Sequence, residues 1–214
     1  MVDPRRERML WAAIAAGQRA CYARYGATRA TAEFDAFSGK VFAVAVLDPE
    51  GVPAAGARIH VRDVEHPLPI ERHFARNALL RSELAQRSAS GVGEVSGLWA
   101  REELAGTGIG ASIVATTIAH APLVGVRQLV AFVHHHHRFN DAVGFRRDER
   151  FGEHPYPDSR YRSVVRWADA RTLDGADTAV RLAILLQRRQ LARGEQIRLN
   201  HPVAPVRRLA AVGA

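Results

Sequence analysis

The sequence predicts an α/β (α+β) protein, and three observations support this fold class. Residues 41–47 and 55–64 are rich in apolar and β-branched residues and are joined by the turn Asp48-Pro49-Glu50-Gly51, which predicts an antiparallel hairpin. Residues 93–100 have the pattern of another strand, and they lead through a glycine-rich loop into a helical pattern at 109–120. A late strand at 160–167 and a long helix after Asp174 complete the mixture of strands and helices.

The remaining elements follow from periodicity and from residues that start or end helices. Asp3-Pro4 begins a helix over 5–24, and residues 70–87 predict one helix that ends at 88–91. Residues 128–133 predict a strand, and 160–167 is expected to pair with a strand near 144–151. We expect one domain over residues 1–200 and a C-terminal tail over 201–214.

The last predicted helix carries one apolar stripe and ends in arginines. The stripe contains Ala176, Ala179, Val180, Ala183 and Leu186. A helix packed on the core explains this pattern, but a homodimer interface or a helix lying on a membrane surface has the same signature. These alternatives stay open.

Composition restricts the partners and the compartment. The 214 residues have a net charge of +8, which comes almost entirely from arginine because Lys40 is the only lysine. CoA phosphates, an acidic acyl carrier protein and anionic lipid would suit this charge, whereas nucleic acid is disfavoured because no basic stretch is interleaved with aromatic residues. The arginines are spread along the chain, so an ordinary solvated surface explains them equally well.

The lone Cys21 excludes an internal disulfide, and no signal peptide or membrane span is evident, so we expect a cytoplasmic protein.

The most informative stretch is the loop from Ala105 to Gly110. Its three glycines, at positions 106, 108 and 110, allow positive φ angles and close approach of the backbone to a bulky ligand. The amides that open the following helix are unpaired donors beside the positive end of its dipole, which favours a pyrophosphate. ATP is disfavoured because no Lys-Ser/Thr follows the loop, and NAD is disfavoured because the next strand carries no acid.

This loop and its neighbours resemble the acyl-CoA-binding half of the GNAT N-acyltransferases. The resemblance rests on Leu98-Trp99-Ala100, on the loop, on strand 128–133 and on Val143-Gly144-Phe145. It implies a mixed, mostly antiparallel sheet whose splayed strands pair with pantetheine, while the loop amides hold the pyrophosphate. The donor-binding residues implied are Leu98, Trp99, Ala100, Ala105, Gly106, Thr107, Gly108, Ile109, Gly110 and Ala111.

The order of motifs upstream is similar to that of acyl-homoserine-lactone synthases and N-acyl amino acid synthases, which are GNAT variants. These motifs run from a helix bearing Arg24 to Glu94-Val95-Ser96. The resemblance implies an acyl-CoA or acyl-carrier-protein donor and the amine of a small, amino-acid-like acceptor. The chain departs from the usual pattern at Ala105, Gly97 and Asn140; Asn140 replaces a tyrosine that protonates the departing thiolate in ordinary members.

Glu94 is the first candidate for the base that accepts the proton of the amine. Strand alternation is expected to put Glu94, Ser96 and Leu98 on one face. A buried acid needs a partner or a function, and a salt bridge to Arg58 is the structural alternative.

The run His134 to His137 is the second candidate site. His134 and His135 lie nearest the strand, and one imidazole could relay a proton from the amine or donate to the leaving sulfur. We expect no metal, because three or four convergent ligands are not supplied nearby.

Acceptor-binding residues are expected on the other side of the thioester. Glu33 and Asp35 could bind the ammonium group, and Arg24 or Arg58 could hold a carboxylate. Ser96 is a further candidate for binding the acceptor. Capping of a turn by Asp35 and ion pairs between these acids and arginines are the structural alternatives. Two other functions stay open at this point: a short-chain GNAT acetyltransferase acting on a drug-like or peptide amine, and a non-catalytic module that binds acyl-CoA.

Overall fold

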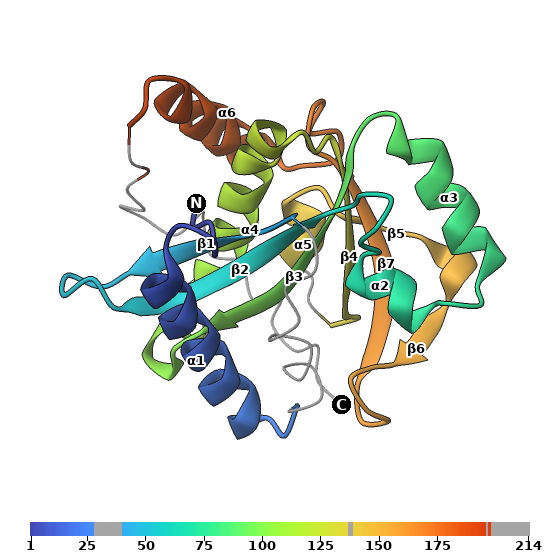
Figure 1. Cartoon of the computed structure of the whole chain (residues 1–214), viewed down its shortest axis with the longest axis horizontal. Helices are drawn as coiled ribbons and strands as arrows, with labels where there is room; N and C mark the ends of the chain where they lie inside the picture. The colour runs from blue at the N-terminus through green and yellow to red at the C-terminus, as the bar shows by residue number, and fades with distance from the viewer. Residues whose placement is uncertain (28–39, 137–138, 196, 198–214) are drawn as a thin grey trace, which may run out of the picture.

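The structure, a computed structural model, describes residues 1–27, 40–136, 139–195 and 197. Its centre is a seven-stranded sheet in the order β1-β2-β3-β4-β7-β5, with β6 paired to β7 (Figure 1). All paired strands are antiparallel except β3 and β4, which are parallel. The predicted mixed, mostly antiparallel sheet flanked by helices is therefore confirmed.

The elements have the following bounds. The strands are β1 (Lys40–Leu47), β2 (Pro53–Val61), β3 (Val92–Ala100), β4 (Gln128–His134), β5 (Arg146–Arg147), β6 (Glu153–Pro155) and β7 (Arg162–Asp169). The α-helices are α1 (Arg8–Arg24), α2 (Pro69–His73), α3 (Ala78–Ser88), α4 (Ile109–His120), α5 (Phe139–Ala142) and α6 (Thr178–Ala192). The short 3-10 helices are η2 (Glu102–Leu104), η3 (Ala121–Val124) and η4 (Glu149–Phe151).

The single helix predicted over 70–87 is wrong, because the chain forms two helices there. After α2 the backbone turns at Phe74, and Asn77 caps α3 by accepting a hydrogen bond from the Leu80 amide at 3.0 Å. An Asn side chain that satisfies one of the unpaired amides of a first helical turn is a strong helix start. The predicted late strand is confirmed as β7, and its predicted partner near 144–151 corresponds to the short strand β5.

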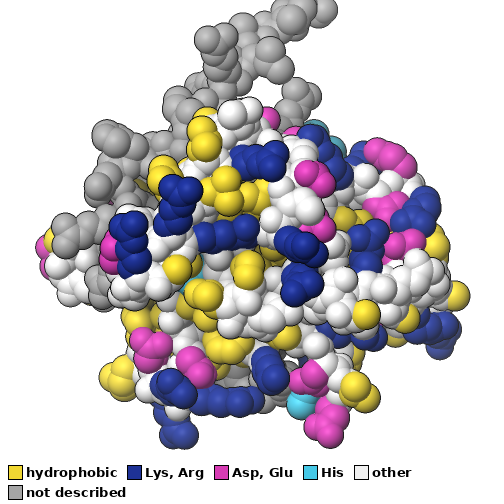
Figure 2. Space-filling view, turned by 90° about the horizontal axis from the view of Figure 1, so that it is seen from above, with side chains coloured by type: hydrophobic (Ala, Val, Ile, Leu, Met, Phe, Trp, Pro, Cys, Tyr) yellow, Lys and Arg dark blue, Asp and Glu magenta, His cyan; other side chains and the backbone are white. Residues whose placement is uncertain are grey.

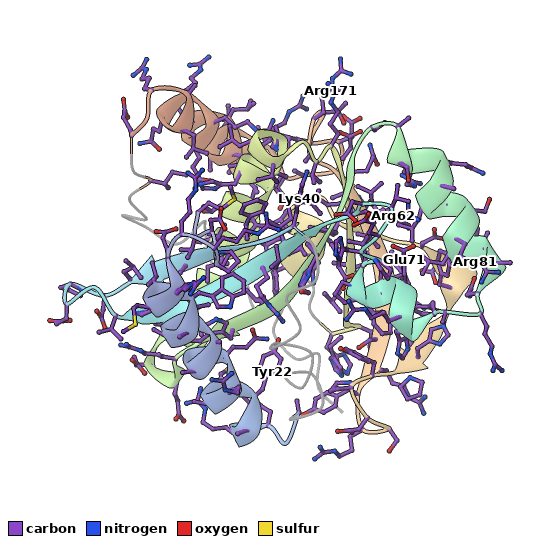
Figure 3. The ribbon with its side chains drawn as sticks, viewed as in Figure 1. Tyr22, Lys40, Arg62, Glu71, Arg81 and Arg171 are labelled. Atoms are coloured by element: carbon purple, nitrogen blue, oxygen red, sulfur yellow. The ribbon has the colours of Figure 1, made fainter. Side chains whose placement is uncertain are left out.

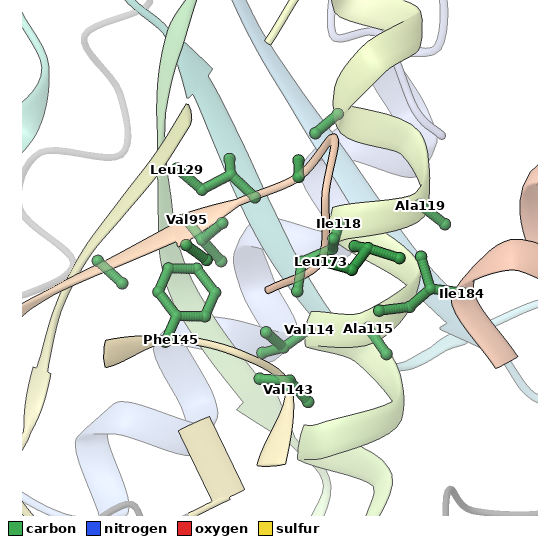
Figure 4. Close-up of a cluster of buried hydrophobic side chains, with 14 of the residues drawn as sticks. Val95, Val114, Ala115, Ile118, Ala119, Leu129, Val143, Phe145, Leu173 and Ile184 are labelled. Atoms are coloured by element: carbon green, nitrogen blue, oxygen red, sulfur yellow. The ribbon is translucent and has the colours of Figure 1, made fainter. Parts of the chain in front are cut away.

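Helices cover both faces of the sheet. Helix α4 packs on one face and carries α6 on its outer side, whereas α1, α2 and α3 lie on the opposite face (Figure 1). The main core cluster fills the α4 side, where Val95, Ile118, Leu129, Phe145 and Ile184 are buried together (Figure 4). The continuous apolar run of α4 agrees with this position, because the helix is enclosed on several sides.

Helix α6 has one buried and one exposed face. Ile184 is buried against the core, and the Arg188 guanidinium donates to the carbonyl oxygens of Ala170 and Ile118. On the other face Leu182 is 56% exposed and Leu186 is 59% exposed. Figure 2, which looks onto the top of Figure 1, shows hydrophobic side chains lying among Lys and Arg side chains. Helix α6 packs on α4, but its buried residues are Val180, Ile184 and Gln187, so the predicted stripe is wrong at Ala179 and Leu186, which are exposed. A homodimer through the outer face stays a prediction.

No helix in the described part of the chain is both long enough and apolar enough to cross a membrane.

Candidate active site

The two central strands separate halfway along their length. The parallel β3–β4 ladder contains only the pairs Val92–Gln128, Gly93–Leu129 and Glu94–Val130. Beyond this point β3 continues to Ala100 beside β2, and β4 continues to His134 beside β7. Among the described residues, each strand thus turns an edge without a strand partner toward the gap, and such an edge can hydrogen-bond an extended ligand. The splay implied by the family resemblance is present.

A β-bulge at Gly97 shapes the β3 side of this gap. Ser96 pairs with Arg58 and Trp99 pairs with Gly56, so Gly97 and Leu98 together stand opposite the single residue Ala57. The φ angle of Gly97 is +62°, and a Cβ there would lie 2.8 Å from the Arg58 Nε and 2.9 Å from the Gln18 Nε2. Both the conformation and the crowding require glycine at this position.

The bulge corrects one sequence-based prediction. Glu94 and Ser96 share a face of β3, but the extra residue turns Leu98 to the α4 side, where it packs with Ile113. The Tyr22 hydroxyl, from α1 on the other face, donates a 3.0 Å hydrogen bond to the Leu98 carbonyl oxygen and so fixes the bulge. Burial raises the pKa of Tyr22 to about 12.

The glycine-rich loop lies at the open end of the splay and leads directly into α4. Gly106 and Gly108 have φ angles of +75° and +85°, and Gly108 is the residue that precedes the first turn of the helix. The Ser112 amide is the first that donates to a carbonyl a full turn earlier, to Gly108 at 3.2 Å. The amides of residues 109–111 have no such carbonyl because of helix geometry, so they form the expected anion-binding end.

One large cavity of about 1390 Å³ connects the loop, the splay and the α1–α2 face of the sheet. This volume exceeds the roughly 300–1,000 Å³ of common small-molecule pockets. Most of the predicted donor-binding residues line it, namely Leu98, Trp99, Ala100, Ala105, Gly106, Gly108, Ile109, Gly110 and Ala111, and so do Glu94, Ser96 and Arg58. Thr107 is not part of the lining; its hydroxyl donates to the Leu104 carbonyl oxygen at 2.8 Å.

Glu94 lies where the two strands begin to separate. It is 4% exposed, and its Oε2 accepts a 2.7 Å hydrogen bond from the backbone amide of Ile70 in α2. Helix α2 is itself held by a bidentate ion pair, in which Arg62 Nε and Nη2 each lie 3.0 Å from a carboxylate oxygen of Glu71 (Figure 3). In the β2–β3 register Glu94 stands opposite His60, not opposite Arg58. Glu94 is thus a buried carboxylate that lines the cavity and is held by a backbone amide from α2.

The three described histidines at the end of β4 and just after it, His134 to His136, differ in position. His134 and His136 line the cavity, whereas His135 is not part of the lining and its Nδ1 lies 3.0 Å from the Arg162 carbonyl oxygen. Burial lowers the pKa of His134, and repulsion from His135 and His136 lowers it further. A lowered pKa keeps the imidazole neutral near pH 7, which suits a proton acceptor better than a proton donor.

Asn140, the residue in the place of the usual tyrosine, also lines the cavity. It belongs to α5 and is 2% exposed. Buried Arg166 on β7 fixes this helix, because its Nη1 lies 2.5 Å from the Asp141 Oδ1 and 3.2 Å from the Phe145 carbonyl oxygen. Asn140 thus lines the cavity at the position where the resemblance implies a tyrosine, and its side chain carries no group that can release a proton.

Of the predicted acceptor-binding residues Arg24, Glu33 and Asp35, the structure describes only Arg24, which does not line the cavity. Arg24 lies outside the lining and pairs with Glu102, with 3.0 Å between Nη1 and Oε2. Glu33 and Asp35 fall outside the described residues, as does the predicted tail over 201–214. Among the residues that the structure describes, no group of three potential ligands is placed to hold a metal ion.

Solved structures resemble this chain over most of its length. FeeM, an N-acyl amino acid synthase from uncultured soil microbes, aligns with a TM-score of 0.58 and 17% identity over 77% of this chain and 94% of its own. A putative N-acetyltransferase from Lactobacillus plantarum aligns with a TM-score of 0.50 and 16% identity over 75% of this chain and 90% of its own. MesI, a CoA-dependent acyl-homoserine lactone synthase, aligns with a TM-score of 0.49 and 16% identity over 85% of this chain and 93% of its own.

The chain has the GNAT fold. No protein-family model matches the sequence, and a search of curated proteins finds no match either. The likeness therefore concerns the arrangement of the elements, and it agrees with the splayed strands and the loop seen in this chain.

Within this GNAT fold the structure brings into the cavity several residues that the sequence analysis did not single out. His60 lies two residues after Arg58 on β2, so strand alternation could have placed it on the same face. His73, Phe132 and Tyr156 also line the cavity, with ring centroids 4.9 to 5.1 Å apart. They come from α2, β4 and the segment after β6, and no local pattern relates these three segments.

Proposed function

We propose that the protein is an N-acyltransferase that moves an acyl group from acyl-CoA to the amine of a small, amino-acid-like acceptor. The observation that carries the proposal is the continuity of one cavity from the glycine-rich loop, through the β3–β4 splay, to the buried carboxylate of Glu94. A thioester bound along this path would have its phosphates at the loop and its reacting carbonyl near the point where the strands separate.

The donor would be held mainly by backbone groups. The first amides of α4 would hold the pyrophosphate, and the open edges of β3 and β4 would pair with the amides of pantetheine. Ala105 supplies no side-chain contact to phosphate, so the loop amides carry this part of the binding. Backbone donors near the bulge at Gly97 and Leu98 are suited to stabilise the oxyanion that forms on the thioester carbonyl.

The acceptor would react as a neutral amine. Its nitrogen attacks the thioester carbon, the C–S bond breaks after the tetrahedral intermediate, and the proton of the amine passes to Glu94 directly or through His134. The neutral state of His134 near pH 7 supports a role as a proton acceptor in this relay. With Asn140 in place of tyrosine, the departing thiolate would take its proton from this relay or from water.

The size of the cavity favours an acyl chain longer than acetyl. If the chain is buried, each added methylene strengthens donor binding by about 0.8 kcal/mol, whereas an acetyltransferase would give a flat series from acetyl to decanoyl. An acyl carrier protein as an alternative donor remains part of the proposal, since the net charge of +8 suits an acidic partner.

Thermal stabilisation by a series of acyl-CoAs tests donor binding. Ligand at 100 times its dissociation constant stabilises the native state by about 2.7 kcal/mol, which corresponds to a rise in Tm of about 5 to 10 °C for a chain of this size. Free CoA should give a smaller rise than decanoyl-CoA. If neither thioesters nor free CoA raised the Tm, this result would count against the proposal. If only an acyl carrier protein raised the Tm, the donor would be the carrier-protein thioester and not acyl-CoA.

A further inference from the structure

Among the buried polar atoms of the cavity wall, two from residues next to Glu94 have no hydrogen-bond partner among the described residues. His60 Nε2 and Ser96 Oγ are both buried, and neither has a partner within the described part of the chain. Both residues line the cavity. A buried polar atom without a partner has lost its hydrogen bonds to water, which costs free energy. Such an atom in the wall of a binding cavity is a candidate contact for a polar ligand.

These two residues lie next to Glu94 on the sheet surface. On β2 and β3, His60 stands opposite Glu94 and Arg58 stands opposite Ser96. Residues two apart on a strand share a face, and neighbouring strands lie about 4.8 Å apart, so the four side chains form one compact patch. We call His60, Arg58, Glu94 and Ser96 the polar quartet. Its dimensions suit a ligand with an amine and a second polar group only a few bonds away.

The electrostatics of the cavity favour an anionic second group. Glu94 is the only acid among the described residues that line the cavity, whereas Arg58, Arg72 and Lys40 contribute positive charges to it. Burial, together with the charges of Arg58 and Arg72, lowers the pKa of His60 to about 3, so its imidazole is neutral at working pH. In the tautomer protonated at Nε2, this neutral ring donates a hydrogen bond, as does the Ser96 hydroxyl.

We infer that His60 and Ser96 are acceptor-positioning residues that donate hydrogen bonds to the carboxylate of an amino-acid acceptor beside Arg58. A carboxylate can accept several hydrogen bonds at once, and donors next to a guanidinium form the kind of site that binds it strongly. With the carboxylate held there, the amine of the same molecule lies within reach of Glu94. The inference rests on the proposed N-acyltransferase function and adds the class of acceptor, a small amino acid with a free carboxylate.

Acceptor kinetics with three matched amines test this inference. They are an amino acid, its amide and the corresponding amine without the carboxylate, each assayed with a saturating acyl-CoA. The wild-type protein should prefer the free carboxylate. Ser96→Ala and His60→Leu should each raise the acceptor KM by roughly 10-fold to 100-fold for the amino acid alone, because each removes one hydrogen bond to a charged group. The donor KM should not change.

Two further variants separate a hydrogen-bonding role from a structural one. His60→Gln keeps an N–H donor near the position of Nε2, so it should recover most of the affinity lost in His60→Leu. Ser82→Ala, on the exposed face of α3, removes a hydroxyl outside the cavity and should leave all acceptor constants unchanged. Equal KM values for the amino acid and its amide in the wild type, or a raised donor KM in Ser96→Ala, would overturn the inference.

Calorimetric titration with the amino acid in the absence of donor distinguishes failure of this inference from failure of the proposed function. Binding that Ser96→Ala and His60→Leu weaken, without any turnover, would keep the carboxylate site and refute the N-acyltransferase. Turnover with no preference for a carboxylate would keep the enzyme and refute the site. Neither binding nor turnover would refute both.

Discussion

The backbone amide of Ile70 donates a 2.7 Å hydrogen bond to Oε2 of Glu94. This contact ties the candidate base on β3 to helix α2, which is locked in turn by the Arg62–Glu71 ion pair. One carboxylate oxygen is thus held by the protein while the strand carrying it lines the cavity. A base fixed in this way needs no rearrangement before it accepts a proton, which favours catalysis by preorganisation.

Glu94→Gln tests this assignment. The Gln carbonyl oxygen can still accept from Ile70, so the fold and donor binding should be kept while the proton acceptor is lost. We expect kcat to fall by about 10²-fold or more, with the remaining rate rising with pH as more free amine becomes available. Glu83→Gln, a buried carboxylate paired with Arg87 and Arg150 outside the cavity, is the control and should keep kcat. Near-full kcat in Glu94→Gln between about pH 6 and 9 would make Glu94 a structural residue.

Gly108→Val should abolish donor binding. The residue has a φ of +85° at the start of α4, and a β-branched side chain is strained there and obstructs approach of phosphate to the loop amides. The measurement is the donor KM together with thermal stabilisation by CoA. Gly125→Val is the matched control, because it has a φ of +78° but lies outside the cavity lining. If both variants raised the donor KM equally, backbone strain, and not loss of the phosphate site, would explain the weaker donor binding.

His134→Gln and His135→Gln should differ in activity although the two residues are adjacent. Only His134 lines the cavity, so we expect its substitution to lower kcat by about 10-fold or more, as for loss of a proton relay. His135→Gln should change kcat by less than about twofold, because the ring lies outside the cavity. The measurement is kcat for both variants at saturating substrates. An equal loss of kcat in both would reject the relay through His134.

Acid should destabilise the protein through His60. Its folded pKa of about 3 lies below the unfolded value, so the unfolded chain binds more protons between these pKa values and stability falls as pH decreases. At pH 5 this single group should cost about 2 kcal/mol relative to pH 8. Urea unfolding at both pH values measures the difference, which should be smaller in His60→Gln. An unchanged pH dependence in that variant would show that His60 is not the group responsible.

The fold class was accessible from sequence because local patterns define its elements. The hairpin, the loop and α4 each have a signature within about a dozen residues, and the splay followed from the resemblance that these motifs carry. The break between α2 and α3 was missed, since it depends on Asn77 capping a helix in the middle of a stretch that has a helical pattern throughout.

The site was only partly accessible for a related reason. Alternation along β3 placed Glu94 and Ser96 correctly, but the bulge at Gly97 changes the face of Leu98 and depends on Arg58 and Gln18, which belong to other elements. Such contacts between elements leave no local signal. In contrast, strand alternation predicts that His134 and His135 point to opposite faces, and of the two only His134 lines the cavity.

Stoichiometric acyl transfer tests the central claim most directly. The protein is incubated with decanoyl-CoA and a panel of amino acids, released thiol is measured continuously, and the amide product is identified by mass spectrometry. We expect sustained, acceptor-dependent thiol release with one N-acyl amino acid formed per thiol, and loss of both in Glu94→Gln. Thioester binding without acceptor-dependent release, or release without an amide product, would contradict it.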